Sequence, residues 1–373
     1  MAGLYIHIPY CHSKCAYCDF YSMPQVGTMP RYIDALVAEA GLRADEINEP
    51  YSTIYIGGGT PSILGADNLA RLLDRLSGVF DFSAVEEITV EVNPEDVTRD
   101  FLHALRRAGV NRISMGVQSF SDDELRLVGR RHTAMQAFEA ALAIKESFDN
   151  FSLDLIFGLP GQTLGSLDAT LKRMLELDAP HLSAYLLSYE QGTKLYASLM
   201  AGKVVEASDE LAHEMYLYVH DALSSAGYHH YEISNYARPG MESRHNSSYW
   251  NSVPYLGLGA SAHSYDGDLR RYNLSNIKEY LSTIESGNAY CLQEPENDEN
   301  KFNDYIITRL RTSSGIDKND LANRPFGYLA PQIDKVVQQL VDAGELVMGD
   351  SGNLAIPYTR WLTSDAVIRE LIL

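Results

Sequence analysis

Six strand-like runs alternate with helical patterns through the first half of this 373-residue chain. Residues 4–8, 53–56, 87–92, 112–115, 153–157 and 181–187 are rich in β-branched and aromatic side chains, and helical patterns separate them. Neighbouring parallel strands need a long crossover connection, which is usually a helix. The alternation therefore predicts an α/β fold, in which helices cover a parallel sheet.

Polar and glycine-rich segments follow the strand-like runs at the points where the strands would end. A cysteine-rich loop follows the first run, and further segments of this kind occur at 57–60, 91–94, 116–119 and 154–160. In parallel barrels the chemistry collects at the carboxyl ends of the strands. We therefore expect the functional residues of this protein to meet at that end of the sheet.

Three of the four cysteines lie within eight residues, because Cys11, Cys15 and Cys18 are separated by three and then two residues. Four cysteines in so long a chain do not make a disulfide framework. A [4Fe–4S] cluster normally takes four cysteines, so three would leave one iron open to another ligand. We weighed two alternatives: a zinc site completed by His7 or His12, and a redox pair of Cys15 and Cys18.

The charge and hydropathy of the chain restrict its partners. Thirty basic and 50 acidic residues give a formal net charge of −20, which argues against binding of nucleic acid. No stretch approaches the roughly 18 consecutive apolar residues that span a bilayer. Residues 1–5 lack the basic region of a signal peptide, so we expect a cytoplasmic protein without a transmembrane segment.

The second half of the chain gives weaker signals. We expect an amphipathic helix over 207–225, a loop holding His245 to Trp250, and a linker at 294–299. Helical patterns near 302–311, 318–323 and 331–343 precede a hairpin near 346–356, which is typical of a winged-helix arrangement. Residues 301–373 carry 8 basic and 9 acidic residues without a basic stripe, so we expect no nucleic-acid contact there either. The expected division is 1–293 and 294–373.

The cysteine spacing after the first strand and the sequence Gly57-Gly58-Gly59-Thr60-Pro61 after the second resemble the radical S-adenosylmethionine (SAM) enzymes. Residues 7–11, 91–94, 116–119 and 154–160 resemble one branch of that superfamily, which holds oxygen-independent coproporphyrinogen III oxidases and the heme chaperone HemW family. The resemblance implies a partial (β/α)6 TIM-like barrel and a small C-terminal winged-helix-like domain. It also implies a [4Fe–4S] cluster on the three cysteines, with S-adenosylmethionine on the open iron.

The same resemblance implies which residues contact S-adenosylmethionine. Glycines would let the backbone approach the ligand, carboxylates would accept from its hydroxyls, and an arginine would pair with its carboxylate. The residues at the matching positions are Tyr5, Gly58, Gly59, Thr60, Glu91, Gln118, Arg130 and Asp154. For the arginine, Arg126 and Arg131 remain nearby alternatives.

Three features separate the oxidases from the chaperones within this branch. The oxidases carry a fourth cysteine two positions after the third, where this chain has Phe20, and they have a longer N-terminal extension. The sequence from His245 to Trp250 has the form HNxxYW, which in the chaperone family is associated with heme binding. The resemblance thus implies heme contact by His245, Asn246, Tyr249 and Trp250, in an extension spanning about 200–293. His229 and His230 are alternative iron ligands.

A heme chaperone would pass its heme to an acceptor protein, such as a respiratory enzyme at the membrane. The alternative function is oxidative decarboxylation of the propionate side chains of coproporphyrinogen III, as in the oxidases. The resemblance leaves open whether S-adenosylmethionine is cleaved, and therefore whether the protein is an enzyme.

Overall fold

The computed structural model describes residues 1–24, 26–289, 291–349 and 352–373. Within these residues a single large sheet carries most of the strands, in the order β12-β11-β10-β9-β1-β2-β3-β4-β5-β6-β8-β7. The strands from β9 to β6 in this order are parallel, and antiparallel strands extend both edges. Because the order has two ends, the barrel that the sheet begins is not closed.

The strands agree with the six expected runs and add to them. The parallel strands are β1 (Ala2–Ile8), β2 (Tyr51–Gly58), β3 (Glu87–Val92), β4 (Arg112–Gln118), β5 (Asn150–Phe157), β6 (His181–Leu186) and β9 (Tyr255–Leu258). The antiparallel strands are β7 (His229–Glu232), β8 (Asn235–Ala237), β10 (His263–Tyr265), β11 (Leu269–Tyr272) and β12 (Leu292–Pro295). The expected parallel sheet is confirmed, and β9 is a seventh parallel strand that the sequence pattern did not reveal.

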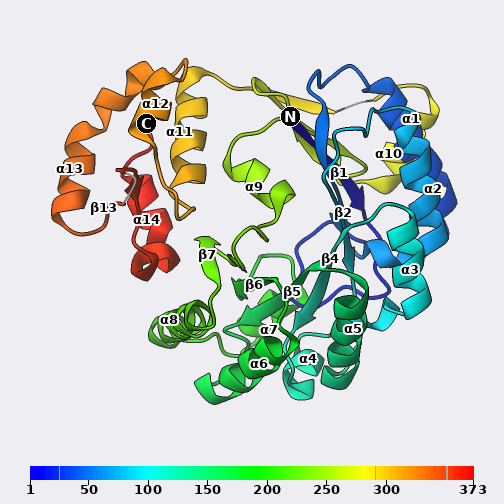
Figure 1. Ribbon diagram of the computed structural model, residues 1–373, viewed down its shortest axis with the longest axis horizontal. Coiled ribbons are helices and arrows are strands. Elements are labelled where there is room, and N and C mark those ends of the chain that lie inside the picture. Colours follow the sequence, from blue (N-terminus) through cyan, green and yellow to red (C-terminus); the bar gives the residue numbers. More distant parts are fainter. Residues whose placement is uncertain (25, 290, 350–351) are drawn as a thin grey trace.

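Helices cover the convex side of the curved sheet, as Figure 1 shows for α1 to α6. The helices of this part are α1 (Met29–Leu42), α2 (Ala66–Ser77), α3 (Arg99–Arg107), α4 (Asp122–Leu127), α5 (Ala134–Ser147), α6 (Leu164–Leu177), α7 (Lys194–Met200), α8 (Asp209–Ser225) and α10 (Ile277–Glu285). Leucines recur on the inner face of α2, where Leu69, Leu72, Leu73 and Leu76 are buried. The core between sheet and helices is therefore apolar.

Helix α9 (Arg244–Trp250) lies on the concave side of the sheet, where it contacts β1 and β2 (Figure 1). The prediction of a loop from His245 to Trp250 is therefore wrong. Ser243 caps the helix by accepting a hydrogen bond from the Asn246 backbone N–H at 3.3 Å. The Glu87 carboxylate on β3 accepts hydrogen bonds from two further backbone N–H groups, those of Arg244 and His245, at 3.0 Å each. These contacts satisfy the free N–H groups of a helix whose serines and asparagine give it little intrinsic propensity.

The C-terminal elements follow the expected order of helices and hairpin. They are α11 (Asp298–Arg309), α12 (Lys318–Asn323), α13 (Asp334–Asp342), the hairpin of β13 (Val347–Met348) and β14 (Leu354–Ala355), and α14 (Ser364–Arg369). The winged-helix assignment and the division at residue 294 stay predictions. The linker expected at 294–299 is wrong, because residues 294 and 295 pair with β11 and α11 begins at Asp298.

Candidate functional site

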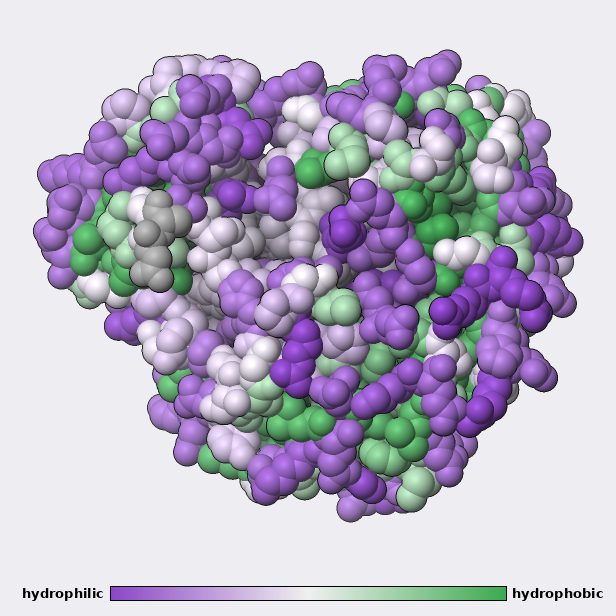
Figure 2. Space-filling model, in the orientation of Figure 1, coloured by the Kyte–Doolittle hydropathy of each residue, from purple (hydrophilic) through white to green (hydrophobic). Residues whose placement is uncertain are grey.

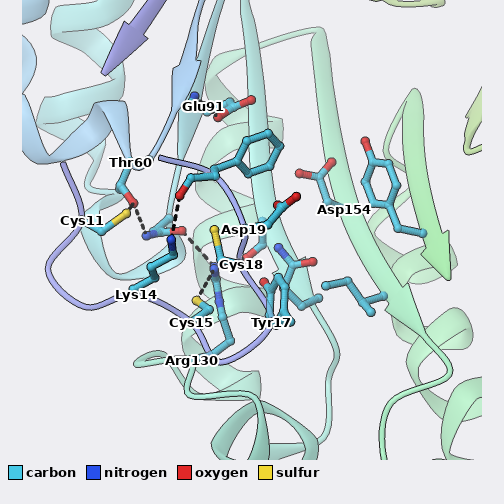
Figure 3. A pocket seen from close by; sticks show the side chains of 18 of the residues that line it. Cys11, Lys14, Cys15, Tyr17, Cys18, Asp19, Thr60, Glu91, Arg130 and Asp154 are labelled. Carbon is cyan, nitrogen blue, oxygen red and sulfur yellow. Dashed lines mark hydrogen bonds between the residues drawn. The ribbon is translucent and has the colours of Figure 1, made fainter. Parts of the chain in front are cut away.

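A cavity of about 420 Å³ opens at the carboxyl ends of strands β1 to β6 (Figure 3). This volume lies in the range of small-molecule and cofactor sites. Residues from the cysteine loop that follows β1 and from the ends of β2 to β6 line it, as expected for a parallel barrel. The lining includes Cys11, Lys14, Cys15, Tyr17, Cys18, Phe20, Gly58, Gly59, Thr60, Glu91, Asn93, Gly116, Gln118, Arg130, Asp154 and Tyr185.

Backbone hydrogen bonds fix the cysteine loop at the edge of this cavity. The N–H of Cys11 donates to the carbonyl of Met23 at 3.1 Å. Ala16 donates to the carbonyl of Val128 at 2.9 Å and accepts from Leu195 at 2.8 Å. The loop is therefore tied to α4 and α7 as well as to its own strand, and the three thiol groups face one side of the cavity (Figure 3).

Two of the thiols have hydrogen-bond donors beside them. Thr60 donates a hydrogen bond to Sγ of Cys11 at 3.4 Å, and Arg130 donates to Sγ of Cys15 at 3.6 Å. Burial raises the pKa of the Cys18 thiol to about 11 and raises the pKa of Cys11 above its ordinary value. Iron must therefore displace these protons when it binds. Three sulfur donors with a cationic neighbour fit a [4Fe–4S] cluster, which is held by cysteine thiolates.

The two histidines considered for a zinc site lie elsewhere. His7 is buried, with Nδ1 hydrogen-bonded to the Tyr5 hydroxyl at 2.9 Å and Nε2 to the Tyr21 carbonyl at 3.0 Å. His12 is half-exposed and lies 3.8 Å from Asp96. Among the described residues, no three histidine, cysteine, aspartate or glutamate side chains form a group that could hold one metal ion. In a [4Fe–4S] cluster each cysteine binds a different iron, so its ligands need not converge in that way.

Packing within the protein explains why positions 58 and 59, at the end of β2, are glycines, whereas the expected reason was approach of the backbone to a ligand. A Cβ on Gly59 would lie 2.7 Å from the Tyr10 carbonyl oxygen and 2.9 Å from that of Ile8. Gly58 has φ +111°, and a Cβ there would lie 2.5 Å from the His7 ring. Both residues are thus glycines because β1 and the cysteine loop pack directly against them. Contact of this backbone with a ligand stays a prediction.

Arg130 enters the cavity, whereas the two alternative arginines do not line it. Nη2 of Arg130 donates to the Gly116 carbonyl at 2.6 Å and to Oδ1 of Asn93 at 2.9 Å. Arg126 is exposed and pairs with Asp123, and Arg131 lies 4.0 Å from Glu95. Asn93, which donates to Thr60 at 3.1 Å, is a site residue that the sequence reasoning missed although it directly follows β3.

Two carboxyl groups face the cavity opposite the cysteines, Glu91 from β3 and Asp154 from β5 (Figure 3). Desolvation raises the pKa of Glu91 to about 7. Hydrogen bonds from the Tyr55 hydroxyl at 2.7 Å and the Gly58 N–H at 3.0 Å act in the opposite direction and lower this pKa. Desolvation also raises the pKa of Asp154. Ionised carboxylates accept hydrogen bonds only, so these two groups can take hydroxyl donors from a ligand.

Of two further residues expected to contact S-adenosylmethionine, Gln118 lines the cavity and Tyr5 does not. Gln118 lines the cavity from a bulge at the end of β4, with φ +68°. A side chain in this left-handed region is strained, and such strain concentrates at functional sites. Tyr5 is not among the described residues that line the cavity. Its hydroxyl bonds to His7, and its ring lies 6.3 Å from the ring of Tyr55.

His245 is enclosed on the concave side of the sheet. Its side chain is 0% exposed, its Nδ1 bonds to the Thr53 hydroxyl at 2.8 Å, and its Nε2 bonds to the Tyr249 hydroxyl at 2.9 Å. Burial lowers the pKa of His245 to about 3, with the charge of Arg112 acting in the same direction. Both ring nitrogens therefore have partners, and the imidazole is neutral at physiological pH.

The other residues of the HNxxYW sequence, Asn246, Tyr249 and Trp250, also lie on α9 and are partly buried. The backbone of Asn246 takes part in the N-cap of α9. Tyr249 and Trp250 line a second cavity of about 420 Å³ between α9 and the C-terminal elements. The alternative iron ligands lie outside the lining of both cavities: His229 is exposed, and His230 is buried between Tyr236 and Trp361.

Comparison with known proteins gives consistent results. A family model described as the Radical SAM superfamily matches residues 5–174. The Heme chaperone HemW of Bacillus subtilis (strain 168) is 38% identical over 349 residues, which is 92% of this chain and 92% of that protein. The Heme chaperone HemW of Escherichia coli (strain K12) is 41% identical over 269 residues, 70% of this chain and 69% of that protein.

Among solved structures, the radical SAM enzyme coproporphyrinogen III oxidase (HemN) from Escherichia coli superimposes with a TM-score of 0.85 and 26% sequence identity. The match covers 100% of this chain and 90% of that one. The chain therefore belongs to the radical SAM superfamily and, within it, to the heme chaperone HemW family.

Proposed function

We propose that this protein binds heme and passes it to an acceptor protein. The observation that carries the proposal is the 38% identity, over 92% of both chains, to a protein named as a heme chaperone. Phe20 supports it, because the resembling oxidases have their fourth cysteine at this position. Phe20 is 62% exposed beside the cluster cysteines, where it supplies no sulfur donor.

The first cavity would hold the cluster and S-adenosylmethionine together. Cys11, Cys15 and Cys18 would bind three irons, and the fourth would take the amino and carboxylate groups of the ligand. Glu91 and Asp154 would accept from its hydroxyl groups, and Arg130 and Gln118 would contact its polar groups. When bound, the cluster and S-adenosylmethionine supply the chemistry of reductive cleavage to a 5′-deoxyadenosyl radical.

Heme would contact α9, whose Tyr249 and Trp250 line the second cavity. The proposed acceptor is a protein that uses heme, such as a respiratory enzyme at the membrane, and the proposed location is the cytoplasm. No described helix has both the length and the apolar composition that a bilayer crossing requires.

A second candidate function is oxidative decarboxylation of coproporphyrinogen III. The TM-score of 0.85 to the coproporphyrinogen III oxidase of Escherichia coli favours it, since the shared fold covers all of this chain and 90% of that one. In this chain Phe20 stands where the resembling oxidases have a cysteine. The two functions differ in their products, so one preparation of protein can decide between them.

The deciding experiment uses anaerobically reconstituted protein in two measurements. Absorbance titration with heme should give a saturable complex of about one heme per chain. Incubation with coproporphyrinogen III, S-adenosylmethionine and a reductant should yield no vinyl product beyond a single turnover. Catalytic product formation, or the absence of a saturable heme complex, contradicts the chaperone function. The Phe20→Cys variant then tests whether the missing thiol is what prevents turnover.

A further inference from the structure

The second cavity is built from four segments of the chain, which lie between residues 249 and 326. Helix α9 and the residues after it give Tyr249, Trp250 and Tyr255, and the β10–β11 hairpin gives Tyr265 and Arg270. Helix α11 contributes Lys301, Asp304 and Tyr305, and the segment after α12 contributes Arg324, Pro325 and Phe326. The molecular surface is hollowed between the C-terminal elements and α9, as Figure 2 shows.

Aromatic rings dominate this lining. The Tyr249 and Tyr255 rings meet edge to face at 4.8 Å, and the Tyr305 and Phe326 rings lie 6.0 Å apart. With Trp250 and Tyr265, six rings surround a space of about 420 Å³. Aromatic side chains present large flat apolar surfaces, and they stack on other flat ring systems in offset or edge-to-face arrangements. The cavity therefore suits a ligand with an extended planar ring system.

Basic side chains gather at this cavity. Three basic residues, Arg270, Lys301 and Arg324, line the cavity with two acidic ones, Asp268 and Asp304, although the whole chain carries 30 basic and 50 acidic residues. The three cations pair with four carboxylates, those of Glu296, Asp304, Asp268 and Asp320, so an anionic ligand binds them only by taking the place of a carboxylate partner.

The three cations differ in how firmly they are held. Arg270 pairs with both Glu296 and Asp304, and its guanidinium lies over the Tyr265 ring at 5.2 Å. Lys301 pairs with Asp268, whose side chain is 86% exposed. Exposed ion pairs contribute little free energy, so Lys301 can exchange this partner for a ligand carboxylate at small cost.

Arg324 is the second exchangeable cation. It pairs with Asp320 at 3.1 Å, and both side chains are more than one third exposed. Its guanidinium also lies 5.5 Å from the centre of the Tyr305 ring, so it stands at the edge of the aromatic lining. Lys301 and Arg324 thus offer two cationic groups beside the rings, on the C-terminal side of the cavity.

We infer that this cavity is the porphyrin site, in which α9 and the C-terminal elements enclose the macrocycle and Lys301 and Arg324 bind its two propionates. The inference rests on the proposed function and adds the location and the means of recognition. Heme would stack against Trp250 and the tyrosines. His245 holds α9 in place through Thr53 and Tyr249 and does not line the cavity, so recognition of the macrocycle does not depend on a bond from His245 to iron.

The test uses metal-free protoporphyrin IX and heme as separate probes of full-length protein, with absorbance and tryptophan fluorescence as readouts. Wild type should bind both. Lys301→Ala and Arg324→Ala should each weaken binding of both probes about tenfold, because each loses a charge-assisted hydrogen bond. Lys335→Ala is the matched control: this exposed lysine on α13 does not line the cavity, and its variant should bind as wild type.

A second set of variants tests the stacking. Trp250→Ala should weaken binding about tenfold, whereas Trp250→Phe, which keeps a ring, should restore most of the affinity. Unchanged circular dichroism and an unchanged amount of bound iron and sulfide establish that the variants fold. Binding by all cavity variants as strong as by wild type would overturn this site and leave the heme-chaperone function standing. Failure of wild type to bind either probe would overturn both.

Discussion

The hydroxyl of Tyr55 donates a 2.7 Å hydrogen bond to Oε1 of Glu91, while the Tyr55 ring stacks on His245 at a centroid distance of 5.1 Å. One side chain therefore contacts both a carboxyl group of the first cavity and the helix that lines the second. Tyr249 extends the connection, since its hydroxyl bonds to Nε2 of His245 at 2.9 Å. The two cavities share this buried set of rings.

The Tyr55→Phe variant should weaken the binding of S-adenosylmethionine. The Tyr55 hydrogen bond favours the ionised carboxyl, so its loss raises the pKa of Glu91 above about 7 and lowers the ionised fraction. We expect affinity at pH 7.5 to fall about fivefold, on the order of 1 kcal/mol, as measured by anaerobic calorimetry. Tyr228→Phe is the control, because the Tyr228 hydroxyl bonds to the Ala179 carbonyl away from the cavity. Equal affinities of Tyr55→Phe and wild type would contradict the role given to Glu91.

The affinity for S-adenosylmethionine should depend on pH. Glu91, with a pKa of about 7, must be ionised to accept a ligand hydroxyl, so affinity should rise as pH increases through 7. Below that value the dissociation constant should increase by up to about tenfold for each pH unit. Equilibrium dialysis between pH 6 and 8.5 measures this dependence. Glu91→Gln should flatten it, and a wild-type affinity that is constant over the range would refute the prediction.

Replacement of any one of the three clustered cysteines by alanine should remove the iron–sulfur cluster. Cys11, Cys15 and Cys18 line one cavity, whereas Cys291 does not line it. We expect the three variants to retain less than about one tenth of the iron and sulfide of wild type, since a cluster with two protein ligands is poorly held. Cys291→Ala should contain as much of both as wild type. Loss of cluster in that control would show that the assignment of ligands is wrong.

The Gly59→Ala variant should disturb the cysteine loop. Its Cβ would meet two carbonyl oxygens of β1 and the loop, at 2.7 and 2.9 Å, and backbone atoms cannot move aside cheaply. We expect a loss of about 1–3 kcal/mol in the free energy of unfolding, measured in urea, together with reduced cluster content. Gly41→Ala in α1 has nothing within 4 Å of the new Cβ and should stabilise by about 0.5–1 kcal/mol. An equal response of the two variants would contradict close packing at Gly59.

His245 should make the protein sensitive to acid. Its pKa is about 3 in the folded protein and about 6.5 when unfolded, so between these values only the unfolded chain takes up the proton. Stability from this group is present above pH 6.5 and decreases as pH falls toward 3. The contribution between pH 7 and 5 is about 2 kcal/mol. Urea unfolding of wild type and His245→Gln at both pH values measures this contribution to the free energy of unfolding. The variant should lose less stability than wild type between pH 7 and 5. Parallel losses would count against a neutral buried imidazole.

The first cavity was predictable because its parts are local in sequence. Many of its residues lie at or just after the end of a strand whose pattern is visible in the chain, and parallel strands bring those ends together. Gln118, which ends β4, illustrates this, whereas Arg130 follows α4. The order of the C-terminal helices and hairpin was visible for the same reason.

The second cavity could not be predicted in this way. Trp250, Arg270 and Lys301 lie on separate elements, and only tertiary packing makes them neighbours. Helix α9 was mistaken for a loop because Asn246, Ser247 and Ser248 have low helix propensity, while the cap from Ser243 and the acceptor Glu87 are supplied by the folded context. Strand β9 has four residues and contains Gly257, so its pattern was too short to recognise.

Strand β1 is paired on both sides, with β2 and with β9. Strand β1, which precedes the cluster cysteines, therefore gains its second neighbour only once Leu258, some 250 residues later, has been synthesised. Closing so long a loop is slow compared with pairing of adjacent elements. Delivery of iron to this protein should accordingly be a late event in its biogenesis, which follows translation of most of the chain.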